Sequence, residues 1–186
     1  MEAFSDGVLA VIITVMVLEL KVPKSADWTA LQELLPVMLS YTLSYVFLGI
    51  YWSNHHHLLQ AITRVDGRVL WANLNLLFWL SLIPFVTAWM GENHFAAAPV
   101  ALYGVILLLA AIAYFILTRM LLALHGREST LATAIGRDFK GQISPVIYLT
   151  AIGAAFFSPK IACALYVLVA VMWLVPDRRI EKTLAR

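Results

Sequence analysis

Several polar side chains stand at the ends of hydrophobic stretches, where lipid offers them no hydrogen-bond partner. The first stretch opens with Ser5 and Asp6, the second ends in three His at positions 55–57, and the third begins with Asn73 and Asn75. Polar groups inside a membrane must find partners within the protein. Because consecutive spans alternate in direction, these groups are expected at one depth. We therefore expect Ser5 and Asp6 to bond to His and Asn side chains of the other two spans.

Three kinds of chemistry are open to this polar cluster. A metal site is disfavoured, because neighbouring His residues on a helix point about 100° apart, whereas zinc on a helix prefers His at i and i+4. A proton pathway, or a proton-coupled transporter, through Asp6 and the His run is the functional alternative, since His titrates near neutral pH and intramembrane Asp–His chains carry protons. A structural lock between helices is the interpretation that the pattern favours.

A second pattern runs along the first hydrophobic stretch. Its members are spaced alternately three and four residues apart, so on a helix they fall within a stripe of about 80°. They are Phe4, Gly7, Val11, Thr14 and Leu18. Such a seam is typical of helix packing. Around the axis of an oligomer, Val11, Thr14 and Leu18 would instead form successive rings, and rings of this kind gate by dewetting or replace an ion's water shell.

The composition places these patterns in a membrane protein. The chain has 186 residues, of which 62% are hydrophobic and 13% charged, whereas soluble domains carry about 25% charged residues. The single Cys163 excludes a disulfide framework within the chain and a Cys-based metal cage. The motifs G-x-S-x-G and H-E-x-x-H do not occur, so an enzyme has little support. We expect the lipid bilayer and further copies of the chain as partners, and neither a nucleic acid nor a cofactor.

Hydropathy predicts an all-α, polytopic protein with a single domain over residues 1–186. Windows of about 20 apolar residues mark candidate spans. The six predicted spans are 4–22, 33–58, 69–90, 97–122, 143–158 and 160–176. Residues 125–142 form the longest polar loop between them.

The basic residues predict the orientation of these spans, because cytoplasmic loops hold the excess of Lys and Arg. One side holds ten basic residues: Arg64, Arg68, Arg119, Arg127, Arg137, Lys140, Arg178, Arg179, Lys182 and Arg186. The other side holds three: Lys21, Lys24 and Lys160. We therefore expect a multi-pass protein of the cell membrane with both termini in the cytoplasm.

The sequence also resembles a known family. FSDGVLAV at residues 4–11, YWSNHH at residues 51–56 and the Asn-rich start of the third span are similar to the lysosomal and bacterial potassium-channel family marked by an FSD motif. The resemblance covers essentially the whole chain, and the single set of six spans resembles the bacterial members. It implies a homotetramer whose first helices line a central pore, and a channel that prefers potassium to sodium without a carbonyl filter.

The resemblance also assigns roles to individual residues. The narrow layers of the pore carry over onto Val11, Thr14 and Leu18, with Val15 as a contributing neighbour. Val11 is smaller than the Ile or Leu that is usual in the first layer, which implies a looser constriction. The family's interhelical polar network behind the pore carries over onto five residues: Ser5, Asp6, His55, His56 and Asn73. The permeant ion that the resemblance implies is K⁺.

Overall fold

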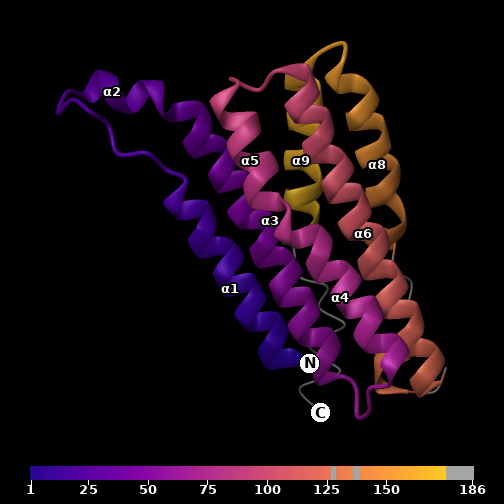
Figure 1. Ribbon diagram of the computed structural model, residues 1–186. Coiled ribbons are helices and arrows are strands. Elements are labelled where there is room, and N and C mark those ends of the chain that lie inside the picture. The colour runs from indigo at the N-terminus through magenta and orange to yellow at the C-terminus, as the bar shows by residue number, and fades with distance from the viewer. Residues whose placement is uncertain (127–128, 136–138, 175–186) are drawn as a thin grey trace.

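The computed structural model describes residues 1–126, 129–135 and 139–174. This part of the chain is helical and contains no strand, so the prediction of an all-α protein is confirmed. Its helices are α1 (Glu2–Leu18), α2 (Trp28–Glu33), α3 (Leu35–Gln60), α4 (Gly67–Ser81), α5 (Ile83–Glu92), α6 (Ala97–His125), α7 (Thr130–Ile135), α8 (Phe139–Ala155) and α9 (Pro159–Leu174). The longer helices form an upright bundle, and α1 lies along one side of it (Figure 1).

Each predicted span coincides largely with a helix or with two consecutive helices. The third span consists of α4 and α5, which meet at Leu82, two residues before Pro84. Proline lacks the N–H that would continue the hydrogen-bond ladder, and its ring clashes with the preceding turn, so a helix breaks at this point. Among the described residues, three helical segments are long and apolar enough to cross a membrane: Leu35–Gln60, Gly67–Glu92 and Ala97–His125. These segments fit a multi-pass membrane protein.

Two local predictions differ from the structure. The first helix ends at Leu18 rather than at residue 22, and it is followed by a connector that leads into the short helix α2. Pro23 disfavours helical geometry in the residue before it, which accounts for an end on the N-terminal side of that proline. The predicted polar loop 125–142 contains the short helix α7 and the first turn of α8 in its described part.

Helix α6 packs against α4, α5, α8 and α9, and helix α1 packs against α3, α4 and α5. Polar side chains inside the bundle bond to each other: the Ser44 hydroxyl is 2.6 Å from that of Thr87 and 3.0 Å from that of Tyr103. Helices α3 and α5 approach closely at Gly91, where an added Cβ would lie 2.7 Å from the Cα of Val37. These contacts make α3 to α6 a closely packed support for α1.

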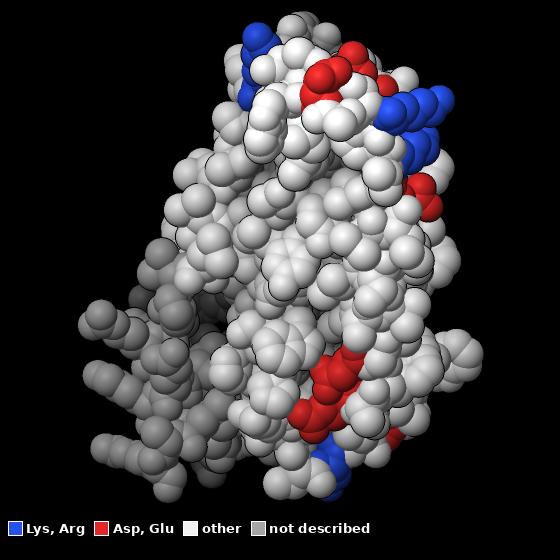
Figure 2. Space-filling model, turned by 90° about the vertical axis from the view of Figure 1, so that its left-hand side faces the viewer, with Lys and Arg blue, Asp and Glu red and all other residues white. Residues whose placement is uncertain are grey.

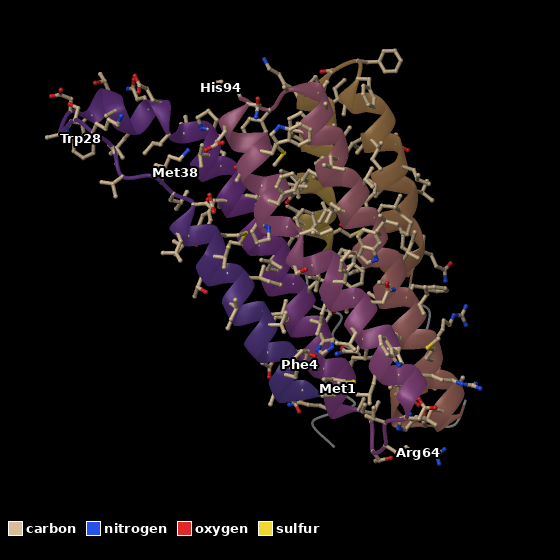
Figure 3. All side chains as sticks on the ribbon, viewed as in Figure 1. Met1, Phe4, Trp28, Met38, Arg64 and His94 are labelled. Carbon is tan, nitrogen blue, oxygen red and sulfur yellow. The ribbon has the colours of Figure 1, made fainter. Side chains whose placement is uncertain are left out.

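The charges of the described residues gather at the two ends of the bundle. On the face that carries α1, Figure 2 shows Lys, Arg, Asp and Glu near both ends and an uncharged band between them. Arg64 and Met1 lie at the same end (Figure 3). Arg64 and Thr63 bond there to the last turn of α6, where the Thr63 N–H donates to His125 Nε2 at 3.1 Å. Of the ten basic residues assigned to this side, Arg64, Arg68, Arg119 and Lys140 are described, and the other six lie outside the described residues.

Candidate functional site

One face of α1 carries the stripe and is uncovered in the single chain. Phe4 is 59% exposed, Val11 60% and Leu18 80%, and Gly7 and Thr14 are exposed as well. The residues of α1 that are buried in the bundle are Ser5, Leu9, Ile12 and Met16. Since the stripe lies on a different face from these residues, it makes no contribution to the packing of α1 on its own bundle.

Thr14 is the polar member of this stripe. Its hydroxyl donates a hydrogen bond to the backbone carbonyl of Val11, with an O–O distance of 2.8 Å. The proton is therefore committed to the helix, and the lone pairs of this exposed oxygen stay available to another group. An oxygen held in this way can accept a hydrogen bond or coordinate a cation.

A groove runs beside the stripe, between α1 and α5. Its volume is about 960 Å³. On the α1 side its lining includes Phe4, Gly7, Val11, Val15 and Glu19, and on the α5 side Pro84, Phe85, Ala88, Trp89 and Glu92. Apolar side chains line most of its length, and the carboxylates of Glu19 and Glu92 stand at the end where α1 ends. Phe4, Gly7 and Val11 therefore belong to both the stripe and the lining of the groove.

Behind the stripe, three buried polar residues connect α1 to α3 and α4. The Asn73 amide donates to the Ser5 hydroxyl at 3.0 Å, and His55 Nε2 lies 2.7 Å from the Asn73 carbonyl oxygen. Ser5 also donates to the backbone carbonyl of Met1 at 3.1 Å. All three residues of the chain Ser5–Asn73–His55 are at most 2% exposed. Asn73 is placed by α4, whose start is capped by the carboxylate of Asp66.

The remaining predicted network residues lie apart from this buried chain. The Asp6 carboxylate accepts from the indole N–H of Trp52 at 3.1 Å, at the exposed edge between α1 and α3. His56 Nδ1 lies 3.1 Å from the Glu2 carboxylate, and the Trp52 ring stacks on the His56 ring with 5.8 Å between centroids. The structure therefore divides the five predicted residues into a buried set, Ser5, Asn73 and His55, and a peripheral set, Asp6 and His56.

Sequence reasoning missed the partners Glu2, Trp52 and Gln60. A signal for them exists, because Glu2 and Asp6 are four residues apart on α1, while Trp52, His56 and Gln60 are four residues apart on α3. Residues at this spacing share one helix face. Gln60 Nε2 lies 2.8 Å from His56 Nε2, which extends the peripheral set along α3. Asn75 is exposed on α4, away from the buried chain.

The polar cluster is not arranged as a metal site in the described part of the chain. No three side chains of His, Cys, Asp or Glu come together there in a way that could hold an ion. The Nδ1 atom of His55 is buried without a hydrogen-bond partner, and its Nε2 faces an amide rather than a carboxylate. The arrangement is suited to fixing one helix against two others.

Comparisons with known proteins agree with this geometry. Residues 1–84 match the model of the family described as the endosomal/lysosomal potassium channel TMEM175. Over 184 residues the chain is 54% identical to a potassium channel from a Chryseobacterium species, covering 99% of this chain and 96% of that one. The chain belongs to the TMEM175 family. The resemblance stated from the FSD motif is thereby confirmed.

Two further relatives in the TMEM175 family are a solved structure and a protein named for proton transport. The crystal structure of a lysosomal potassium-selective channel TMEM175 homolog from Chamaesiphon minutus superposes with a TM-score of 0.80 and 28% identity, over 94% of both chains. A zebrafish protein named an endosomal/lysosomal proton channel is 25% identical over 129 residues, which cover 67% of this chain and 24% of that protein. Members of the TMEM175 family are channels and not enzymes, so the prediction of a non-enzymatic protein is confirmed.

Proposed function

We propose that the protein is a potassium-selective cation channel, built as a homotetramer of six-span subunits in the cell membrane with the α1 helices around a central pore. The observation that carries this proposal is the uncovered stripe of α1, which holds a single hydroxyl, Thr14, among apolar residues. One stripe cannot enclose a path, whereas a cyclic arrangement of identical stripes can. The potassium channels of Chryseobacterium and Chamaesiphon minutus support potassium as the permeant ion.

The stripe supplies three rings in such a tetramer. With a rise of about 1.5 Å per residue, the rings of Val11 and Thr14 are separated by about 4.5 Å, and those of Val11 and Leu18 by about 10.5 Å. The apolar rings would exclude water and act as hydrophobic constrictions. Between them, four Thr14 oxygens would offer lone pairs to a partly dehydrated cation, because each hydroxyl proton is held by the Val11 carbonyl. This ring takes the place of a carbonyl filter.

The buried chain Ser5–Asn73–His55 would serve as the anchor of each pore helix. It lies on the face of α1 opposite the proposed pore and joins α1 to both α3 and α4. A fixed rotation of α1 about its own axis is what keeps Thr14 directed at the ions. The ten basic residues assigned to one side support cytoplasmic termini, and residues 1–186 would form one channel domain.

A proton pathway is the second candidate, and the zebrafish relative that is named a proton channel favours it. Asp6 and the His residues would carry the protons. The geometry gives this route less support, because the Asn73 amide stands between His55 and Ser5. A carboxamide neither gains nor loses a proton near neutral pH, so it does not pass one on. Asp6 is bonded to Trp52 rather than to a His.

Ion flux from liposomes containing the purified protein tests the channel proposal. The experiment compares potassium with sodium gradients for the wild type, Leu18→Ala and Thr14→Ala. Matched controls are Leu149→Ala and Thr150→Ala on α8, because Leu149 is exposed and Thr150 likewise donates to a carbonyl of its own helix. We expect potassium-preferring flux that rises several-fold in Leu18→Ala, and a changed potassium-to-sodium ratio in Thr14→Ala, with both controls unchanged.

The opposite results would reject particular parts of the proposal. Equal effects of the α1 and α8 variants would remove α1 from the pore. An unchanged ion preference in Thr14→Ala would remove Thr14 from the selectivity layer. Flux of protons without flux of potassium in all variants would favour the proton pathway.

A further inference from the structure

The salt bridges of the described residues both involve α1 or the connector that directly follows it. At one end, Glu2 pairs with His56 of α3, with 3.1 Å between the carboxylate and Nδ1. At the other end, Lys21 pairs with Glu92, the last residue of α5, with 2.6 Å between Nζ and the carboxylate. Ion pairs are thus placed where the helix that carries the stripe begins and ends.

The end of α1 near Leu18 has little other attachment to the bundle. The last buried residue of α1 is Met16, and Val17 and Leu18 are exposed after it. The groove separates this part of α1 from α5, with Glu19 on one wall and Glu92 on the other. Beyond α1, the connector runs away from the bundle before it returns through α2 (Figure 1). The Lys21 side chain reaches from this connector to Glu92 at the end of α5, 71 positions further along the chain.

We propose that the Lys21–Glu92 ion pair holds the end of α1 against α5 and thereby sets the width of the constriction at Leu18. This inference rests on the proposed function, in which Leu18 forms a ring around the ion path. Leu18 is three residues before Lys21, and the backbone N–H groups of Glu19 and Leu20 between them donate to carbonyls in the last turn of α1. A displacement of Lys21 therefore moves Leu18 with it. The stripe faces away from the bundle, and the tie therefore draws Leu18 away from the axis and keeps the ring wide.

The chemistry of the pair suits a tie that acts at neutral pH. The hydrogen bond and the charge of Glu92 raise the pKa of Lys21 above its usual value, so the Lys21 ammonium stays charged. The side chains are 76% and 50% exposed, and an exposed pair is weak and sensitive to salt. A weak tie in each of four subunits adjusts a constriction without locking it, which makes Lys21 and Glu92 positioning residues and not ion ligands.

The test is potassium flux from liposomes for Lys21→Gln, Glu92→Gln and the charge-exchanged double variant Lys21→Glu/Glu92→Lys. If the pair is a tie, both single variants lower the flux, by about two- to five-fold or more, and the exchanged pair restores it. If these charges act only on the ion concentration at the pore mouth, the two single variants change the flux in opposite directions. The control variants Lys24→Gln and Glu33→Gln remove the same kinds of charge from exposed residues outside the ion pair. We expect no comparable effect from them.

Each other outcome overturns the proposal. An outward tie would be excluded if the single variants left the flux unchanged, changed it in opposite directions, or both raised it. It would also be excluded if the charge-exchanged double variant did not restore the flux. Leu18→Ala, measured in parallel, separates this failure from failure of the proposed function. If Leu18→Ala changes the flux and the ion-pair variants do not, the tie alone is wrong. If Leu18→Ala has no effect either, the position of the pore is wrong and the tie is rejected with it.

Discussion

The substitution Asn73→Ala tests whether the buried chain anchors α1. Asn73 is 2% exposed and bonds to Ser5 and His55 with both ends of its amide. Removing the amide leaves His55 Nε2 without a partner in a ring whose Nδ1 already has none. An orphaned buried polar group costs about 1–3 kcal/mol, although interhelical bonds in membrane proteins average nearer to about 0.6 kcal/mol. The lost side-chain volume adds to this cost. We therefore expect Asn73→Ala to lower the free energy of unfolding by about 2–3 kcal/mol.

The same reasoning predicts a smaller effect for Asp6→Ala. Asp6 accepts one bond from Trp52 at an exposed edge, and Trp52 is itself 47% exposed, so its indole N–H can find another partner. We expect a loss below about 1 kcal/mol, in the range of exposed polar pairs.

The assay is the thermal midpoint of the detergent-solubilised protein, followed by size-exclusion chromatography after heating. With about 2–4 °C per kcal/mol for a chain of this size, Asn73→Ala should lower the midpoint by about 4–12 °C and Asp6→Ala by less than about 4 °C. Asn75→Ala is the matched control, because the same change is made two residues away on an exposed face of α4. The anchoring role of the buried chain would be refuted if all three variants lowered the thermal midpoint equally. It would also be refuted if Asp6→Ala lowered the midpoint more than Asn73→Ala.

Two further substitutions and one matched control test the packing of the helices against each other. Gly91→Ala should cost about 1–3 kcal/mol through overpacking, because the new Cβ would meet the backbone of α3 at Val37; Gly153→Ala, where the space is open, should be neutral or stabilising by up to about 1 kcal/mol in the same thermal assay. Tyr166→Phe should cost about 0.5–1.5 kcal/mol, since it removes the bond from the buried hydroxyl to the Val100 carbonyl; a midpoint equal to that of the wild type would show that this bond is not needed.

Hydropathy and periodicity account for much of the fold. Long apolar windows predicted where helices lie, because a membrane-length run of apolar residues leaves the backbone few other conformations. The stripe on α1 was predicted from spacing alone, and the structure leaves its residues exposed. The break at Leu82 was not predicted, since an apolar window gives no weight to the proline that interrupts the hydrogen-bond ladder. The end of α1 at Leu18 was also not predicted, because Leu20 and Val22 extend the apolar stretch to Pro23.

The positions of the polar residues along the membrane normal were not enough to predict which of them bond to each other. Shared depth grouped Ser5 and Asp6 with the His and Asn residues, but adjacent residues on a helix point about 100° apart. Ser5 therefore enters the bundle while Asp6 lies at its edge. In the same way, His55 points to Asn73 and His56 to Glu2. These residues lie in one layer of the bundle. The rotation of each helix about its axis decides which of their side chains come into contact.

The placement of charged and uncharged residues along α1 would affect how a channel of this kind selects ions. A lipid bilayer accepts an apolar stripe, so exposure of Val11 and Leu18 does not by itself require a partner. Acidic side chains stand beside both ends of that stripe, with Glu2 and Asp6 at one end and Glu19 at the other, and the band between them carries no charge (Figure 2). Negative charge at the mouths of a path concentrates cations and repels anions. In the proposed channel, discrimination between cations would then fall to the uncharged band, where Thr14 supplies the polar oxygen of the stripe.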